Sequence, residues 1–132
     1  MPKEFSYRGK SLAELQALSV DDFGKIGTSR MRRSLSRGFN KQLSAHIDKA
    51  KETLSHAKEP KAIRTHLRDT IIIPKMVGLK FAVYRGNSFE TITIAPEMMG
   101  HYLGEMVLTR KRLQHGKAGI GATKSSTAIT AR

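Results

Sequence analysis

The chain has 132 residues and no cysteine, and its 24 Lys and Arg side chains against 11 Asp and Glu give a formal net charge of +13. This length allows one domain with a modest core, and the missing cysteines exclude disulfides, thiolate catalysis and thiolate zinc sites, as in a cytoplasmic protein. No apolar run reaches the ~18 residues of a membrane span, and the first residues do not resemble a secretory signal. The excess positive charge repels itself, so we expect a polyanionic partner, with nucleic acid favoured over an acidic membrane surface.

Two short helices are predicted first. Ser11 followed by Glu14 fits a capping box, in which the hydroxyl and the carboxylate each satisfy a free backbone N–H, and the helix continues to about Leu18. Ser19 followed by two acidic residues repeats the start signal, because the helix dipole favours negative charge in the first turn. Glycines keep this second helix short.

The next two helices differ in character. From Thr28 the pattern is helical and strongly basic, with arginines at i, i+3 and i+7 on one face, namely Arg30, Arg33 and Arg37. A longer helix follows and ends near Ala57, before Pro60. Its other face carries lysines and is read as mainly solvated surface. Its apolar stripe consists of Phe39, Leu43, Ile47, Ala50 and Leu54.

Residues 61–108 predict a small sheet. The β-branched run 70–73, closed by Pro74, is typical of a buried strand. Gly86-Asn87 fits a type II′ turn, which places Phe81 opposite Ile92 on one face of a hairpin. The same register pairs Leu79 with Ile94, Val83 with Glu90, and Tyr84 with Phe89. The predicted fold is α+β, with the N-terminal helices packed on a three-stranded mixed or antiparallel sheet.

Residues 96–105 are predicted to join this body to an extended basic arm. Residues 109–132 carry six Lys and Arg and no acidic residue, and they have too few large apolar groups to offset the entropy of ordering. We therefore expect the isolated arm to be disordered. The chain divides into a helical part (1–60), a strand and hairpin core (61–108) and a flexible basic tail (109–132).

The candidate chemistry is electrostatic. The five histidines show no metal-ligand spacing, so no metal or cofactor is expected. His101 with Glu105 could form an acid–base set, but a packing or RNA-contacting histidine is favoured. Arginine's planar fork suits phosphate and bases, so the basic patches favour binding over solubility. Few aromatic residues are free to stack, which favours folded RNA over a single strand as the partner.

Several motifs, in order, resemble a universal family, the small-ribosomal-subunit protein family numbered nineteen, in its archaeal and eukaryotic branch. The most specific is Met98-Met99-Gly100-His101-Tyr102-Leu103-Gly104-Glu105, within the longer match Pro96-Glu97-Met98-Met99-Gly100-His101-Tyr102-Leu103-Gly104-Glu105. The others are Phe5-Ser6-Tyr7-Arg8-Gly9, Arg32-Arg33-Ser34-Leu35-Ser36-Arg37-Gly38, Lys61-Ala62-Ile63-Arg64-Thr65-His66-Leu67-Arg68-Asp69, Ile72-Ile73-Pro74-Lys75-Met76-Val77-Gly78 and His115-Gly116-Lys117-Ala118-Gly119-Ile120-Gly121-Ala122-Thr123.

This resemblance implies a non-enzymatic protein in the head of the small subunit, bound to the 3′ domain of the ribosomal RNA beside the protein numbered thirteen. Its tail would reach toward transfer RNA near the decoding region. The expected rRNA-binding residues are Arg30, Arg32, Arg33, Arg37, Lys61, Arg64, Thr65, His66, Arg68, His101, Arg110, Lys111, Arg112, His115 and Lys117. The expected tRNA-proximal residues are Lys124, Ser125, Ser126 and Arg132.

Two alternatives belong to other classes. The helices between Ser11 and Arg37 could form a DNA-binding helix-turn-helix, although the turn carries two glycines and no dimerisation stripe is evident. Preference for a duplex DNA site over structured RNA would support that hypothesis. An enzyme acting on RNA would need further groups to converge on His101 and Glu105, and the sequence shows none.

Overall fold

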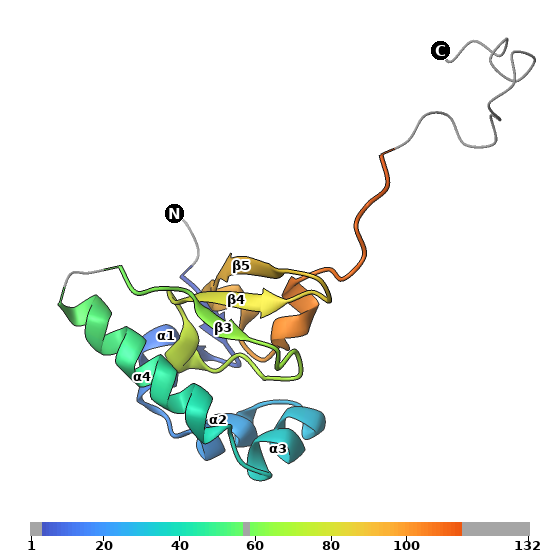
Figure 1. The fold of residues 1–132 in the computed structure, drawn as a ribbon. Helices are drawn as coiled ribbons and strands as arrows, with labels where there is room; N and C mark the ends of the chain where they lie inside the picture. The colour runs from blue at the N-terminus through green and yellow to red at the C-terminus, as the bar shows by residue number, and fades with distance from the viewer. Residues whose placement is uncertain (1–3, 57–58, 115–132) are drawn as a thin grey trace, which may run out of the picture.

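The computed structural model describes residues 4–56 and 59–114. Helices lie below and beside a small sheet (Figure 1), so the predicted α+β class is confirmed. The helices are α1 (Leu12–Ala17), α2 (Val20–Ile26), α3 (Ser29–Ser36) and α4 (Lys41–Ser55). The main sheet contains β3 (Ile63–Thr65), β4 (Lys80–Tyr84) and β5 (Phe89–Thr93), while β1 (Ser6–Tyr7) and β2 (Lys10–Ser11) form a separate antiparallel pair that was not predicted.

The helix starts follow the predicted capping chemistry. The Glu14 carboxylate accepts the Ser11 N–H at 3.1 Å, and the Ser19 hydroxyl accepts the Asp22 N–H at 3.1 Å. A third hydroxyl, that of Thr28, caps α3. Side-chain acceptors thus satisfy N–H groups that the first turn of each helix leaves free.

The apolar stripe of α4 packs into the core over most of its length. Leu43, Ile47 and Ala50 are buried, as predicted, and belong to one cluster with α1, α2, α3 and the sheet. Leu54 is 43% exposed, so its predicted place in the core was wrong. The reason is geometric: the last turn of α4 projects past the edge of the sheet (Figure 1). The expected helix end, Ala57, lies outside the described residues.

The hairpin has the predicted register. Phe81 lies opposite Ile92, Val83 opposite Glu90, and Tyr84 opposite Phe89. The Arg85 N–H donates to the Ser88 carbonyl at 2.9 Å, which closes the two-residue turn. Gly86 has a φ of 109°, a value that side chains disfavour and that a type II′ turn needs at its first central position. The residues of the turn were therefore enough to predict the strand register of this hairpin correctly.

The predicted strand at residues 70–73 was wrong. Ile71, Ile72 and Ile73 are buried, but the run forms only an isolated bridge from Ile71 to Tyr102. Ile72 exchanges hydrogen bonds with residues 100–101, where the chain is turning, so no continuous ladder develops. The third strand is instead β3, which pairs in parallel with β4. Its signal was the alternation of buried Ile63 and Thr65 around exposed Arg64, in a stretch interpreted only as polar and basic.

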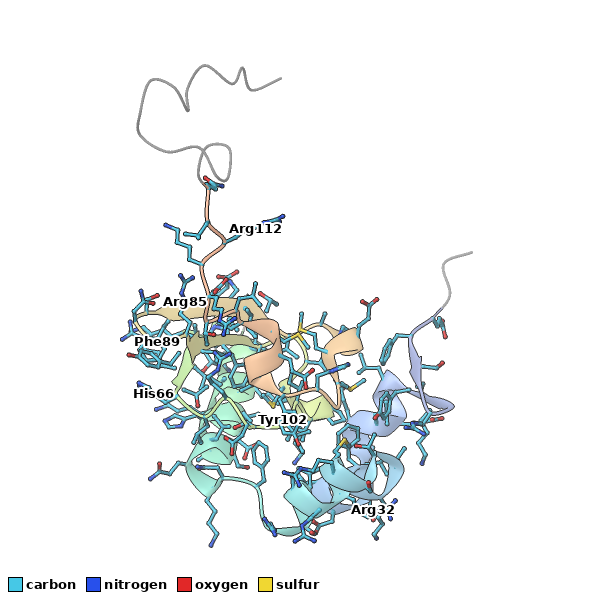
Figure 2. The ribbon with its side chains drawn as sticks, turned by 90° about the vertical axis from the view of Figure 1, so that its right-hand side faces the viewer. Arg32, His66, Arg85, Phe89, Tyr102 and Arg112 are labelled. Atoms are coloured by element: carbon cyan, nitrogen blue, oxygen red, sulfur yellow. The ribbon has the colours of Figure 1, made fainter. Side chains whose placement is uncertain are left out.

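Residues 96–107 are a packed joint. Met99, Leu103 and Val107 are buried, whereas Leu108 is 74% exposed, so the body ends at Val107. From there the chain leaves the side of the hairpin turn and carries Arg112 away from the body (Figures 1 and 2). The expected disorder of the isolated arm, residues 109–132, stays a prediction, and residues 115–132 of that arm lie outside the described part.

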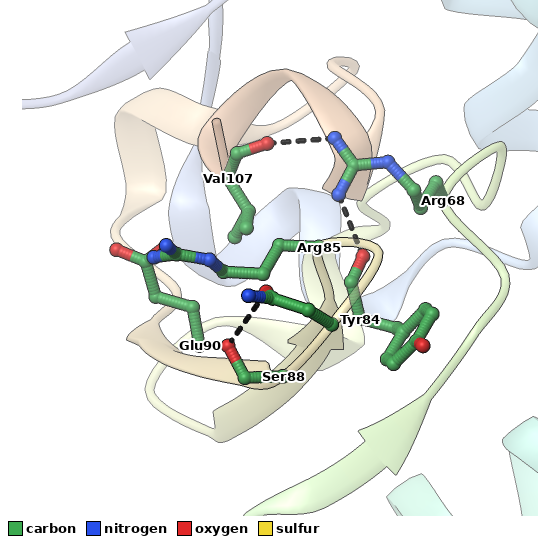
Figure 3. Close-up of polar contacts among 7 residues, drawn as sticks. Arg68, Tyr84, Arg85, Ser88, Glu90 and Val107 are labelled. Atoms are coloured by element: carbon green, nitrogen blue, oxygen red, sulfur yellow. Dashed lines mark hydrogen bonds and ion pairs between the residues drawn. The ribbon is translucent and has the colours of Figure 1, made fainter. Parts of the chain in front are cut away.

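One arginine holds this joint against the sheet. The half-buried guanidinium of Arg68 donates to the carbonyls of Tyr84 (2.8 Å), Gly104 (2.8 Å) and Val107 (2.6 Å). Figure 3 shows it between the end of β4 and Val107. The Arg68 carbonyl in turn accepts the Gly104 N–H at 2.8 Å. A Cβ at residue 104 would lie 2.9 Å from that carbonyl oxygen, so this approach requires glycine.

We predict that Arg68→Met lowers the free energy of unfolding by about 2–3 kcal/mol, because backbone carbonyls lose a charged donor. The measurement is urea denaturation of the full chain. Arg33→Met makes the same chemical change at an exposed helical site and should stay within about 0.5 kcal/mol of the unmodified chain. Equal effects of the two substitutions would contradict a structural role for Arg68.

Candidate nucleic-acid interface

Most of the predicted RNA-binding side chains are exposed. These are Arg30, Arg32, Arg33, Arg37, Lys61, Arg64, His66, His101, Arg110, Lys111 and Arg112. Thr65 is 7% exposed and its hydroxyl accepts the Leu67 N–H, while the Arg68 guanidinium is hydrogen-bonded within the fold. For these two residues the structure shows a role in the fold, and RNA contact stays a prediction. The remaining predicted residues, His115, Lys117, Lys124, Ser125, Ser126 and Arg132, lie outside the described part.

A first hollow, the α3 hollow, lies between α3, the α3–α4 connection and residues 67–71. It measures about 690 Å³, and Arg30 and Arg37 line it together, as their shared helix face predicted. Arg33 and Arg32 are exposed but do not line it. Phe39 and Tyr102 also line it, and Asp69 is its acidic residue. Two arginines at the rim of a half-apolar hollow suit an RNA backbone.

A second hollow, the sheet hollow, lies between α4, residues 59–62 and the outer face of the sheet. It measures about 930 Å³. Its basic side chains are Lys49, Lys61 and Arg64, and Ala82 and Thr91 are among the small residues that line it. Lys49 was read from the sequence as solvated surface. Lys49 of α4 and Arg64 of β3 thus come together on one surface, although they are separated in the chain.

An aromatic cluster lies next to the sheet hollow. The ring centroids of His66 and Tyr84 are 4.6 Å apart, those of His66 and Phe89 5.1 Å, and those of Tyr84 and Phe89 5.2 Å. Arg64 lies over the Phe89 ring at 5.6 Å. In Figure 2, His66 and Phe89 lie together, far from Arg32. The hairpin register already paired Tyr84 with Phe89, but the approach of His66 depends on β3, which was not predicted.

Lys51 of α4 and Lys75 of the short 3-10 helix Pro74–Met76 repel each other. The pKa of Lys51 is lowered from 10.5, first by burial of its ammonium group and then by the positive charge of Lys75, with Asp48 opposing the shift. Both side chains are half-buried. A charge that is costly to hold in the free protein becomes favourable beside a phosphate.

His101 and Glu105 form an exposed pair. His101 Nδ1 lies 2.7 Å from a Glu105 carboxylate oxygen, and the side chains are 55% and 48% exposed. Within residues 4–56 and 59–114, no group of three His, Cys, Asp or Glu side chains could hold a metal ion. The pair spans one turn of the packed joint, so it orients the histidine ring at the surface.

Comparison with known proteins gives a consistent result. A family model described as "Ribosomal protein S19" matches residues 33–115. The small ribosomal subunit protein uS19 of Halorubrum lacusprofundi is 48% identical over 124 residues, which are 94% of this chain and 88% of that protein. The uS19 of Saccharolobus solfataricus is 46% identical over 124 residues, covering 94% and 89%. In the described part of the chain, no helix combines the length and apolar character of a membrane span.

We predict that Lys51→Met raises the free energy of unfolding at pH 7 by less than about 1 kcal/mol, because solvent screens the charges. The pKa of Lys51 is lower in the folded chain than in the unfolded chain. As the pH rises, the folded chain therefore loses the Lys51 proton before the unfolded chain does. The unmodified chain therefore gains stability as the pH approaches 10.5, and the difference between the chains should shrink over this range and disappear above it.

Urea denaturation between pH 7 and pH 10.5 measures this difference. Lys49→Met, at an exposed position of the same helix, is the control for the change of side chain. A Lys51→Met effect that does not depend on pH would mean that packing, and not charge, is responsible.

Proposed function

This chain belongs to the ribosomal protein S19 family, whose members are structural and not enzymatic constituents of the small ribosomal subunit, and we propose that it binds small-subunit ribosomal RNA in the cytoplasm. It holds the RNA through exposed arginines and lysines that displace counterions from phosphates. Family membership weighs against the helix-turn-helix regulator and the enzyme acting on RNA.

The observation that carries the proposal is the placement of the arginines. Arg68 is hydrogen-bonded within the fold, whereas Arg30, Arg37 and Arg64 are exposed at two hollows. A rigid core holds these guanidinium groups at separate points, so they can meet phosphates of a folded RNA without much reordering of the protein. Because binding costs less when groups are preorganised, this arrangement favours structured RNA over a flexible strand.

The finer parts of the proposal rest on the family resemblance and on the arm. We place the contact at the 3′ domain of the RNA, beside the head protein numbered thirteen. The exposed arm residues Arg110, Lys111 and Arg112 begin the path by which residues 109–132 reach toward transfer RNA. The described start of the arm points away from the body (Figure 2), which fits that path.

For Arg33→Ala and Arg64→Ala we predict weaker binding to a transcript of the archaeal 3′ domain. The slope of log affinity against log salt should flatten by about one unit for each lost phosphate contact. Filter binding at several salt concentrations measures the slope.

Lys25→Ala is the matched control, because Lys25 is already paired with Asp22 at 2.8 Å on α2. It should leave the slope unchanged. Slopes that stay constant in both arginine variants would show that neither arginine contacts phosphate.

Removal of residues 109–132 tests the arm. Since the described arm residues are exposed and the core ends at Val107, we expect the melting temperature to change by no more than a few degrees. Small subunits reconstituted with the shortened chain should bind transfer RNA more weakly. Unaltered transfer RNA affinity would contradict the proposed path, and an unfolded body would contradict the boundary at Val107.

A further inference from the structure

We propose that the outer face of the sheet is a stacking platform for one unpaired RNA base, with Phe89 as its main surface and Arg64, His66 and Tyr84 around it. This inference rests on the proposed RNA-binding function and deepens it. It also revises the expectation, drawn from the sequence, that few aromatic residues are free to stack.

The rings gather on the solvent side of the sheet, where the core does not require them. Phe89 is 36% exposed, and two rings reach it: Tyr84, the last residue of β4, and His66, the residue that follows β3. The Tyr84 hydroxyl donates to the Gly86 carbonyl at 2.6 Å, which fixes the orientation of its ring. An aromatic surface that is held in place before binding loses little entropy when a base stacks on it.

The space beside Phe89 is open and has a polar rim. Ala82 and Thr91 line the sheet hollow together with Phe89, and their short side chains leave room next to the ring. Lys61 and Lys49 line the same hollow and are placed to meet the phosphates on either side of the base. The hollow's acidic residue, Glu59, is paired with Lys80 at 3.3 Å, which reduces its repulsion of a phosphate.

Arg64 provides a second planar surface. Its guanidinium carbon lies 5.6 Å from the centre of the Phe89 ring, and its side chain is exposed. No ion pair within residues 4–56 and 59–114 engages it. It can therefore shift outward and cover a base that lies on Phe89, because guanidinium groups stack on π-faces as well as bind phosphate.

The α3 hollow lacks this combination. It contains Phe39 and Tyr102, but the close ring pairs of the described residues are Tyr7 with Phe23 and the three at the sheet. Arg30 and Arg37 there lie beside Asp69, with no aromatic cluster. Phe39 is therefore the matched control residue, since it is a phenylalanine at the other basic hollow.

The test uses the full chain and two probes of equal charge, a single-stranded uridine hexamer and an abasic ribose-phosphate hexamer. The unmodified chain should bind the base-bearing probe about tenfold more tightly, within the range known for one stacked base. Phe89→Leu should abolish this preference while leaving the affinity for the abasic probe and the salt slope unchanged. Phe39→Leu should keep the preference.

Arg64→Lys tests the same platform without changing the charge or the hairpin. It should reduce the preference severalfold, because ammonium does not stack as guanidinium does. As a direct readout, the methyl NMR signal of Ala82 should move with the base-bearing probe and not with the abasic one.

The outcomes separate the two proposals. If the chain binds the 3′-domain transcript but shows no base preference, or if both Phe89→Leu and Arg64→Lys retain it, the stacking platform is refuted and the ribosomal function stands. Loss of the preference in Phe39→Leu alone would move the site to the α3 hollow and also refute this inference. If the chain binds neither the transcript nor the hexamers, both proposals fail.

Discussion

The hydrogen bonds of Arg68 are the constraint on which the arrangement of this protein depends. Its guanidinium joins the end of β4 to Gly104 and Val107 of the joint, two segments that are distant in the chain from each other and from Arg68. Without a charged donor at this place, the carbonyls would face one another unsatisfied and the joint of residues 96–107 would have few polar ties to the sheet. The arm begins directly after Val107, so the hydrogen bond from Arg68 to the Val107 carbonyl (Figure 3) holds the point from which the arm leaves the body.

The remaining surface arginines can then serve another purpose. The apolar cluster formed by the four helices and the sheet holds the backbone, and the helix caps satisfy its free N–H groups. In the described residues, Arg68 is the arginine that bonds the joint to the sheet. Arg30, Arg37 and Arg64 take no part in the joint and are exposed at hollows between elements. Their mutual repulsion opposes folding, and a polyanion relieves it. Family membership identifies that polyanion by class, and the geometry proposes how it is held: phosphates at the arginines, and one base on the rings of the sheet.

Local chemistry predicted a large part of this fold. Helix starts at Ser11 and Ser19 follow from side chains within three residues, and the hairpin register follows from Gly86-Asn87. What the sequence did not predict depends on partners distant in the chain. The strand Ile63–Thr65 pairs with residues 81–83, and the short run resembles a basic loop until that partner is known. Leu54 continues a regular apolar stripe, yet α4 extends beyond the surface that would cover it. For the candidate site, residue type predicted the exposed arginines but could not separate Arg68 from them, because a charge held inside by carbonyls and a charge offered to RNA look the same in sequence.

The central claim is that Arg68 stabilises the fold while other arginines are exposed and bind RNA. Arginine-selective chemical modification tests this claim most directly. The full chain would be treated with a dicarbonyl reagent, free and within the assembled small subunit, and the modified positions read by mass spectrometry. We predict that Arg68 is unreactive in both states, and that Arg30, Arg37 and Arg64 react in the free chain and are protected in the particle. Ready modification of Arg68 in the free, folded chain, or undiminished reactivity of the other three in the particle, would contradict the account.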